Sequence, residues 1–533
     1  MRDKFLAEQK QGLLQGRLNR RDFITSMVAA GVALPTAMSL SDSVMAMTPK
    51  SGGHFRVGFG HGSTTDSLDP GTTENSKMTG VNFAYGQCLT EVDSDGTLIP
   101  ELAESYESVD GKTWVFKLRQ GVEFHNGKTL APEDVIASLQ YHMGEDSKSA
   151  AKGLLTSVTG LKADGNNVIV ELDSADAGFP FIISDYHLLI LPSSGGKIDV
   201  QAGIGTGPYK LENFEPGVRA EFSKNDNYWK EGRQHFDSLE YLALVDTTAR
   251  QNAVMNGDVD VATRIDPKTV SLMKRVPTIR ILEQAGTLHY TFPMRLDVAP
   301  FDNYDLRMAC KYAINRQELV DKILLGHGVV GNDHPISTAN QYHASNLPQR
   351  EFDPDKVRHH LKKAGMEGVT IPLSASDAAF AGAVDAAQLI KASAAQGGLN
   401  IEVVREPSDG YWSNVWNKKG WCACYWGGRP TEDWMFKSAY VADTEWNDTA
   451  WRDTDGAKLF NALVLQGRSE LDDEKRRSIY AECQQLISDD GGAIVPMFAN
   501  HIHAVSKKVA TPEKVAGNWE ADGHKACERW WFA

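Results

Sequence analysis

Residues 98–128 read LIPELAESYESVDGKTWVFKLRQGVEFHNGK, and this stretch decides the fold class of the chain. Thr113–Leu118 is predicted to be a strand, since it is rich in aromatic and β-branched residues. The side chains expected to fill one face of the sheet are Phe116, Leu118, Val122 and Phe124. Packing roles of this kind identify a fold rather than a ligand.

Strand signals alternate with helix signals along the rest of the chain. Further strands are predicted at residues 55–60, which end in a glycine-rich loop, and at residues 167–172, after a turn at 164–166. No internal repeat and no linker rich in proline or serine is visible in the sequence. The expected class is therefore α/β, with lobes that share more than one crossing of the chain.

Helix boundaries are marked by capping residues. A helix is predicted to begin at Pro132, whose fixed φ suits the first turn. Asn315 is expected to cap a second helix that stops at Gly326, and Asp353 precedes a third that ends at Gly365. These are structural features and carry no site.

The first 46 residues read as an export signal. The sequence RRDFI at 20–24 opens an apolar stretch of small residues that runs to residue 40, and VMA at 44–46 offers a cleavage site. We predict a twin-arginine signal peptide and a periplasmic protein. The alternative is an N-terminal amphipathic or membrane-anchoring helix, but the stretch is short for a bilayer and Pro35 interrupts it.

Composition limits the partners of the chain. With 533 residues, 41% of them hydrophobic, the chain can form more than one domain. Its formal charge is −15, and without residues 1–46 there remain 49 basic and 66 acidic side chains. An acidic protein repels nucleic acid and anionic lipid, so neither is expected as a partner. Six cysteines are too few for a disulfide scaffold, although an oxidising compartment would permit one or two bridges.

Several further motifs follow the opening stretch in a fixed order. They are Leu68-Asp69-Pro70, GTGPYKL at 205–211, Asn227-Tyr228-Trp229, QNAVMNGDVD at 251–260, and Pro300-Phe301-Asp302-Asn303 through Arg307 to Ala313-Ile314-Asn315-Arg316. With these motifs, nearly the whole chain after residue 46 resembles the peptide-binding family of ABC solute receptors, the group containing dipeptide, oligopeptide and nickel binders. The resemblance implies the two-lobed periplasmic-binding-protein fold (type II, cluster C).

This fold implies a definite division of the chain. Lobe I is expected at 47–290, with an extra subdomain at roughly 85–200, lobe II at 291–497, and a return to lobe I at 498–533. The two hinge crossings are expected near 288–294 and 494–498. Closure of such lobes is a population shift, because a ligand that contacts both stabilises the closed form.

An aromatic stretch at 411–436 is expected to carry much of the ligand site, since aromatic side chains beside Gly427-Gly428 provide a stacking surface with close backbone approach. The alternative is a buried aromatic cluster of lobe II. The expected ligand-binding residues in the two lobes are Phe59, His61, Tyr85, Arg295, Trp412, Tyr425, Trp426, Gly428, Arg429 and Glu432.

Arg429 is the most informative of these residues. The sequence WGGR at 426–429 matches the family segment in which dipeptide binders have an aspartate in the last place, so the charge is inverted here. A guanidinium suits a carboxylate, sulfate or phosphate and repels an ammonium group. Arg295 could supply a second positive contact. The alternative for each arginine is an internal ion pair, for Arg429 with Glu432 or Asp433.

The expected function is binding without catalysis. No Gly-x-Ser-x-Gly or His-Glu-x-x-His motif is present, and no catalytic residue, cofactor or metal ligand is predicted. The protein is expected to be a monomer that delivers a peptide-like or carboxylated small molecule to an inner-membrane ABC permease. Two alternatives remain, a metal or metal-chelate receptor of the nickel type and a periplasmic hydrolase. His501 and His503, on one face of a probable strand, could hold a metal.

Overall fold

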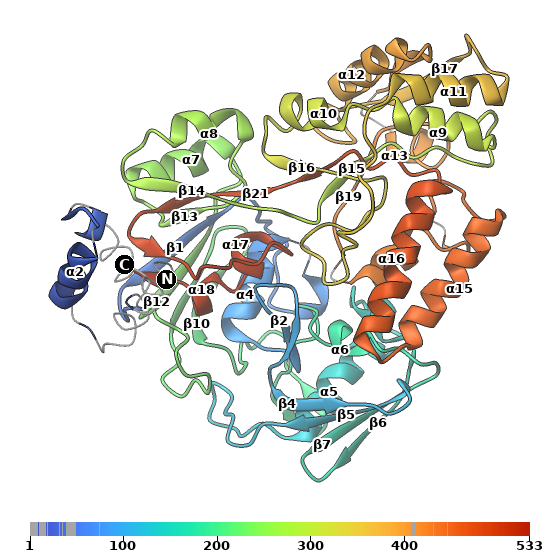
Figure 1. Cartoon of the computed structure of the whole chain (residues 1–533). Helices are drawn as coiled ribbons and strands as arrows, with labels where there is room; N and C mark the ends of the chain where they lie inside the picture. The colour runs from blue at the N-terminus through green and yellow to red at the C-terminus, as the bar shows by residue number, and fades with distance from the viewer. Residues whose placement is uncertain are drawn as a thin grey trace.

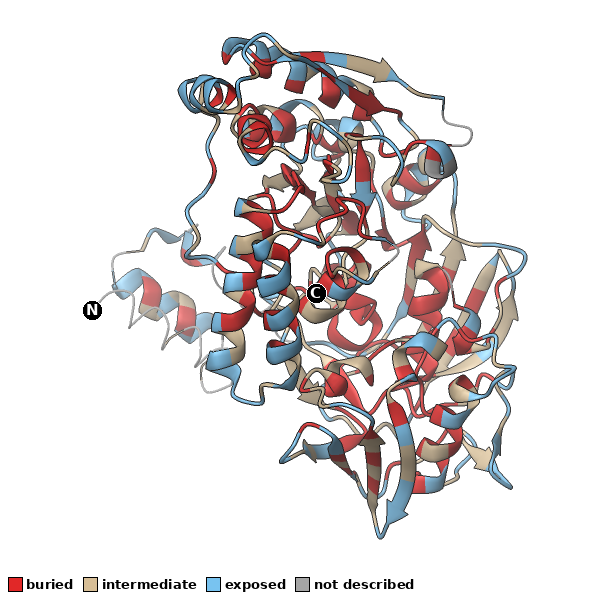
Figure 2. Ribbon diagram, turned by 90° about the vertical axis from the view of Figure 1, so that its right-hand side faces the viewer, coloured by how far each residue is buried: buried red, intermediate tan, exposed pale blue. Residues whose placement is uncertain are grey.

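The computed structural model describes residues 9, 18, 20–30, 32–34, 36–38, 49–73, 75–407, 411–429, 431–444 and 446–533, apart from the side chains of 20, 412 and 413. The chain forms two lobes, with a small sheet packed against the first (Figure 1). Buried residues follow the strands and the inward faces of the helices (Figure 2). In the described residues, no helix is both long and apolar enough to cross a membrane.

Lobe I is built on a seven-stranded sheet of described strands. Their order is β10 (Tyr209–Glu215), β11 (Arg219–Lys224), β12 (Ser238–Ala243), β1 (His54–Phe59), β13 (Val261–Ala262), β21 (His501–Ser506) and β14 (Ile279–Gln284). β1 runs parallel to β12 and β13, and β21 pairs antiparallel with β13 and β14. The strand predicted at 55–60 is therefore confirmed as a central one. The covering helices are α4 (Ser76–Tyr85), α7 (Thr247–Asn256) and α8 (Pro267–Met273).

The opening sequence stretch forms a separate antiparallel sheet, called the subdomain here. Its strands lie in the order β4 (Ala103–Glu107), β5 (Thr113–Leu118), β7 (Asn167–Leu172) and β6 (Val158–Asp164), and α5 (Pro132–Met143) packs on them. The predicted strands at 113–118 and 167–172 are confirmed. The four predicted face residues, Phe116, Leu118, Val122 and Phe124, are all buried in one core cluster. The short elements beside this sheet are β2 (Thr90–Val92), β3 (Leu98–Pro100), α6 (Phe179–Ile182), β8 (Ser193–Ser194) and β9 (Lys197–Ile198).

Lobe II contains a four-stranded sheet, a two-stranded sheet and two groups of helices. The described strands are β16 (Gly328–Val330), β20 (Met497–Ala499), β15 (His289–Thr291) and β19 (Cys424–Trp426), and separately β17 (Thr370–Ala375) with β18 (Asn400–Arg405). The first group of helices is α9 (Tyr304–Tyr312), α10 (Arg316–Lys322), α11 (Pro354–Ala364) and α12 (Ala383–Gln396). The second is α13 (Tyr411–Asn414), α14 (Glu432–Ala439), α15 (Asp455–Ser469) and α16 (Asp473–Asp489). In Figure 1, α15 and α16 extend from lobe II toward the subdomain.

Predicted helix caps are largely confirmed. Pro132 is the first residue of α5, and Asp353 accepts hydrogen bonds from the first turn of α11, which Gly365 ends in a left-handed conformation. Asn315 caps α10 as predicted, accepting from the backbone N–H of Glu318. However, α10 ends at Lys322 rather than at Gly326, and the residues after it form an irregular turn in which Gly326 has φ of 80°.

The two connections between the lobes lie side by side. β14 leads through residues 285–288 to β15, and β20 leads through Asn500 to β21. β14 pairs with β21, and β15 pairs with β20, so the crossing is a two-stranded ribbon. The crossings expected at 288–294 and 494–498 are displaced by a few residues, because β15 and β20 are already strands of the lobe II sheet.

Most of the predicted signal segment lies outside the described residues. Its described part includes α2 (Arg20–Ala29), in which Phe23 and Met27 pack against Ala37. All six cysteines lie in the described part of the chain, and all are free and buried.

A buried ionic cluster attaches the C-terminal segment to lobe I. The segment contains β22 (Val509–Ala510), α17 (Glu520–Gly523), α18 (Ala526–Arg529) and β23 (Trp531–Phe532). Lys230 Nζ lies 2.5 Å from Glu91, 2.9 Å from Glu101 and 3.0 Å from Glu528. Lys525 pairs with Glu101 at 3.0 Å and Arg529 with Glu91 at 2.5 Å. Burial would raise the pKa of Glu91, but the three cations hold it well below its usual range.

We predict that Lys230→Met destabilises the protein by about 3–5 kcal/mol, because it leaves three buried carboxylates with only two cations, Lys525 and Arg529. The free energy of unfolding, measured by urea denaturation, would show this loss. Lys117→Met is the control, since Lys117 pairs with Glu104 on the exposed face of the subdomain and should change stability little. Equal effects of the two substitutions would contradict the prediction.

Candidate functional site

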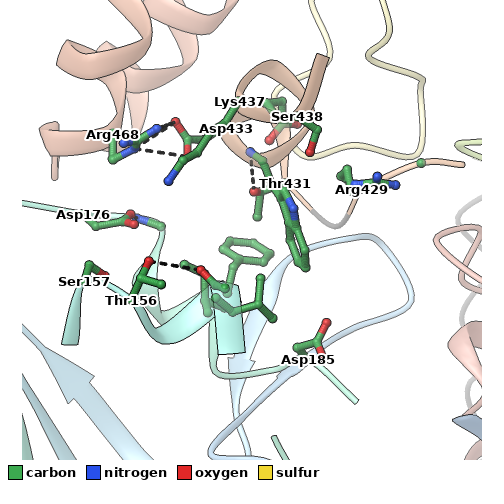
Figure 3. Close-up of a pocket in the computed structure, with 18 of the residues that line it drawn as sticks. Thr156, Ser157, Asp176, Asp185, Arg429, Thr431, Asp433, Lys437, Ser438 and Arg468 are labelled. Atoms are coloured by element: carbon green, nitrogen blue, oxygen red, sulfur yellow. Dashed lines mark hydrogen bonds and ion pairs between the residues drawn. The ribbon is translucent and has the colours of Figure 1, made fainter. Parts of the chain in front are cut away.

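A cavity of about 790 Å³ lies between the two lobes (Figure 3). The subdomain contributes its loops around 150–157 and 173–187, and the C-terminal segment contributes Trp519. Lobe II contributes residues 428, 429, 431–434, 437 and 438, together with side chains of α15 and α16. A molecule in this cavity would therefore contact both lobes at once.

Arg429 lines the lobe II side of the cavity, three residues after the end of β19. Its Nη1 donates a hydrogen bond of 2.9 Å to the carbonyl of Gly427, and its guanidinium lies 5.8 Å from the ring centre of Trp426. Among the described residues no carboxylate lies within ion-pair distance of it. Burial lowers the pKa of Arg429, and Tyr186 across the cavity opposes that effect. The guanidinium is therefore a cation still able to accept an anionic partner.

The internal ion pair considered for Arg429 does not form, because both candidate carboxylates are engaged elsewhere. Glu432 accepts a hydrogen bond of 2.8 Å from the backbone N–H of Tyr342, and burial raises the pKa of Glu432 to about 7. Asp433 receives three hydrogen bonds of 3.1–3.2 Å from Arg468. Both residues lie in the first turn of α14, which Thr431 caps.

Gly428 allows the lobe II chain to approach the hinge. A Cβ atom at this position would lie 1.8 Å from Oγ1 of Thr287, which belongs to the outward crossing. A larger residue cannot fit here without moving the backbone. Gly428 therefore places Arg429 beside the hinge, at the edge of the cavity.

The opposite wall, from lobe I, is aromatic. The rings of Tyr186 and Trp519 pack edge to face with centres 5.4 Å apart. Next to Tyr186, Asp185 accepts from Nδ1 of His187 at 2.6 Å, while Nε2 of that ring lies 3.0 Å from the carbonyl of Thr73. These contacts fix the loop that carries Tyr186. The wall presents aromatic ring surface to the cavity.

In lobe I, the predicted ligand residues do not line the cavity. Phe59 and Tyr85 are 2% and 0% exposed and belong to the lobe I core. The hydroxyl of Tyr85 donates to the carbonyl of Leu68, so it is satisfied internally. His61 is partly exposed but bonds Ser76 at the start of α4, and it does not line the cavity.

In lobe II, some of the expected ligand residues line the cavity and others do not. Gly428, Arg429 and Glu432 line the cavity. Arg295 does not, because its guanidinium pairs with Asp297 at 2.6 Å and donates to Asn417.

Among the aromatic residues of the 411–436 stretch, some are buried in lobe II and one lines the cavity. Trp426 is buried behind Arg429 and donates to Asp448, and Trp421 is buried, as the aromatic-cluster alternative holds. Tyr425 is 44% exposed but lies outside the cavity lining. Trp434 of the same stretch does line the cavity. The side chain of Trp412 lies outside the described residues.

Sequence reasoning missed the residues that lobe I brings to the cavity. Asp176, Tyr186 and Trp519 line it, yet they come from segments in which no motif was recognised. Their spacing along the chain contains no signal, since 519 follows the second hinge crossing. Only the fold brings these residues together.

Metal-ligand chemistry finds little support in the described residues. The carboxylates that approach one another closely enough to share an ion, Glu91, Glu101 and Glu528, already hold Lys230 and two other cations. The rings of His501 and His503 lie parallel with centres 6.4 Å apart, and no third ligand completes a group with them among those residues.

Comparisons with known proteins agree with this architecture. The glutathione-binding protein GsiB of Pectobacterium atrosepticum is 25% identical over 92% of this chain and 95% of its own length. The solved structure of AgaA from Agrobacterium tumefaciens R10, in complex with agropinic acid, matches with a TM-score of 0.68 and 22% identity, over 90% of this chain and 99% of its own. The solved structure of HbpA2 from Haemophilus parasuis matches with a TM-score of 0.78 and 21% identity, over 88% of this chain and 99% of its own.

The fold is accordingly the two-lobed, type II periplasmic-binding-protein fold, with an extra subdomain in the first lobe. Residues 97–448 match the family model described as bacterial extracellular solute-binding proteins, family 5, middle part. This match covers well over half of the chain, and the chain therefore belongs to the family 5 bacterial extracellular solute-binding proteins.

Proposed function

We propose that this protein is the solute-binding component of an ABC importer and that it captures a peptide-like or otherwise carboxylated small molecule between its lobes. The observation that carries the ligand class is Arg429, a partly buried guanidinium without a carboxylate partner among the described residues, at the wall of the interlobe cavity. A planar carboxylate can accept two parallel hydrogen bonds from such a group.

The rest of the cavity suits the body of such a ligand. Tyr186 and Trp519 present aromatic surface from lobe I, and Trp434 presents it from lobe II. A ligand held by both walls stabilises the closed arrangement, because the open arrangement lacks one set of contacts. The names of two similar proteins support the ligand class, since one refers to glutathione and the other was solved with agropinic acid.

The cellular setting follows from the same proposal. Residues 1–46 would be a twin-arginine signal, and the exported monomer would act in the periplasm and deliver its ligand to an inner-membrane permease. Lobe I would comprise 47–290, its subdomain roughly 85–200, lobe II 291–497, and the return 498–533. The acidic composition supports partners other than nucleic acid or a membrane surface.

A metal-chelate receptor and a periplasmic hydrolase are the competing functions, and each has a distinct signature. One metal ion per protein molecule, found in the untagged purified protein, would favour the metal-chelate receptor. Conversion of a bound ligand by the purified protein would favour the second. Among known relatives, the similar proteins named above are binding proteins.

The ligand class can be tested on the molecule that the protein captures. Mass spectrometry of the small molecule released by denaturing gently purified protein should identify a carboxylic acid. That acid should raise the melting temperature, since ligand at a hundred times Kd adds about 2.7 kcal/mol to stability. Its carboxamide analogue is the matched control and should raise the melting temperature far less. An equal rise with acid and amide would argue against the proposed ligand class.

The role of Arg429 can be tested by substitution. Arg429→Gln should weaken binding of that acid by about 1.5–3 kcal/mol, or roughly ten- to a hundredfold in Kd, because a charged hydrogen-bond donor is lost. Isothermal titration measures this change. Arg280→Gln is the control, since Arg280 lies on β14 outside the cavity and donates to Val509 and Thr511. Unchanged affinity in Arg429→Gln would contradict the role given to this residue.

A further inference from the structure

A second charged group at the cavity also lacks a partner, at the point where the lobes touch. Asp176 lies in the loop between β7 and α6 of the subdomain, opposite Asp433 and Arg468 of lobe II (Figure 3). The next residue, Ala177, donates a backbone hydrogen bond of 2.5 Å to the carbonyl of Arg468. This carbonyl is in the last turn of α15, where helical carbonyls have no partner within the helix. The bond joins the lobes beside the cavity.

The loop holds Asp176 rigidly in that contact. Its backbone N–H donates to the carbonyl of Gly111 at 2.9 Å, and its carbonyl accepts from Nε1 of Trp114 at 3.1 Å. One carboxylate oxygen accepts from the backbone N–H of Gly178 at 2.8 Å. Asp176 therefore cannot turn away when the lobes meet.

The guanidinium of Arg468, which lies opposite Asp176, is already neutralised. Arg468 donates both from Nε and from Nη2 to Asp433, as a forked pair within lobe II. Within the described residues, no basic side chain lies at ion-pair distance from Asp176. The negative end of the α15 dipole also faces this contact. An ionised Asp176 thus meets a second carboxylate and a helix C-terminus, and the cation that faces it without a carboxylate partner among the described residues, Lys437, is not at ion-pair distance from it.

We propose that Asp176 makes closure of the cleft dependent on proton uptake: the lobes close most readily when this carboxyl group is neutral. The proposal concerns regulation of the site described above and so rests on the proposed function, but it needs no ligand to be tested. In the open arrangement Asp176 would face water and ionise normally. On closure it would take up a proton, which removes its repulsion with Asp433.

The electrostatic surroundings support this linkage. Burial, and next the charge of Asp433, raise the pKa of Asp176 to about 6 from the ordinary 3.8, although Arg468 and Lys437 oppose the shift. The groups that face it from lobe II are Asp433 and Lys437 on α14, Arg468 on α15 and Tyr480 on α16. From its own lobe, the neighbouring charges are Asp110, Lys112 and Asp173, of which Asp110 accepts from the backbone N–H groups of residues 112 and 113.

The sign of the effect follows from these values. A carboxyl group whose pKa is higher in the closed form than in the open form favours closure as the pH falls. Little effect remains above about pH 7.5, where Asp176 is ionised in both forms. At about pH 5, the ratio of closed to open protein should be roughly tenfold higher than at about pH 7.5.

The test measures lobe closure in ligand-free, full-length protein. Spin labels at Val109→Cys in the subdomain and Leu465→Cys on α15 report the distance between the lobes, since these positions are 97% and 63% exposed. The six native cysteines are buried, so the labels react with the two new ones. Electron paramagnetic resonance then gives the fractions of short and long distances at each pH.

In the wild type, the short-distance fraction should increase as the pH falls from about 7.5 to about 5. Asp176→Asn keeps the acceptor for Gly178 but has no charge, so its short-distance fraction should be high and independent of pH. At about pH 7.5 its closed-to-open ratio should exceed that of the wild type, by at most about a hundredfold. Asp173→Asn, an exposed carboxylate of the same loop, is the matched control and should behave as the wild type.

Asp433→Asn provides an independent check. It frees Arg468 to pair with ionised Asp176, so the lobes should close at about pH 7.5 without proton uptake. A wild-type distance distribution that does not change with pH would overturn the proposal, as would an equal pH response in Asp176→Asn. A shift of Asp176→Asn toward long distances would instead identify an attractive role for the carboxylate.

The labelled protein carries no ligand, so these results are independent of whether a carboxylated ligand binds at Arg429. Failure of every acid to bind would overturn the proposed function and leave the closure measurement intact. Loss of pH dependence would overturn the present inference and leave the ligand class intact.

Discussion

A charge removed from water needs a partner, and this constraint organises the molecule. Where the C-terminal segment returns to lobe I, the carboxylates of Glu91, Glu101 and Glu528 meet Lys230, Lys525 and Arg529, and each of these groups has an opposite charge beside it. Such matching lets six charges be buried together, because each group loses water but gains a counter-charge. The cluster thereby joins segments that are more than 400 residues apart in the chain.

At the cavity, each wall carries a charged group that has no oppositely charged partner among the described residues. Arg429 on the lobe II side has no carboxylate partner among the described residues, and Asp176 on the lobe I side has no cation at ion-pair distance there. Unpaired, partly desolvated charges cost stability, and in binding proteins they are most readily explained by a partner that arrives later. For Arg429 that partner would be an anionic ligand, and for Asp176 it would be a proton.

The fold makes both groups sensitive to the angle between the lobes. The two crossings form one paired ribbon, from β14 and β21 into β15 and β20, so a narrow connection joins the lobes. Gly428 lies against Thr287 of this ribbon, which fixes Arg429 close to the pivot. Ala177 bonds the end of α15 instead, so closure would bring its neighbour Asp176 from water toward Asp433. Closure of the lobes would therefore affect both ligand binding at Arg429 and the surroundings of Asp176.

The sequence by itself determined the local elements and the family to which they belong. Strands at 113–118 and 167–172, the proline start of α5 and the glycine end of α11 follow from side-chain alternation and from dihedral preferences, which act between near neighbours. The inverted charge at Arg429 was also visible, since it stands within a recognisable motif.

Only the tertiary structure decided which residues share the cavity. Tyr85 looked like a ligand residue but fills the lobe I core, while Tyr186 and Trp519 belong to no motif and meet across the fold. It also decided the partners of the arginines, since Arg295 pairs with Asp297 and Arg429 pairs with neither Glu432 nor Asp433. The physical reason is that packing and charge pairing depend on distances between segments remote in sequence, which local side-chain patterns do not encode.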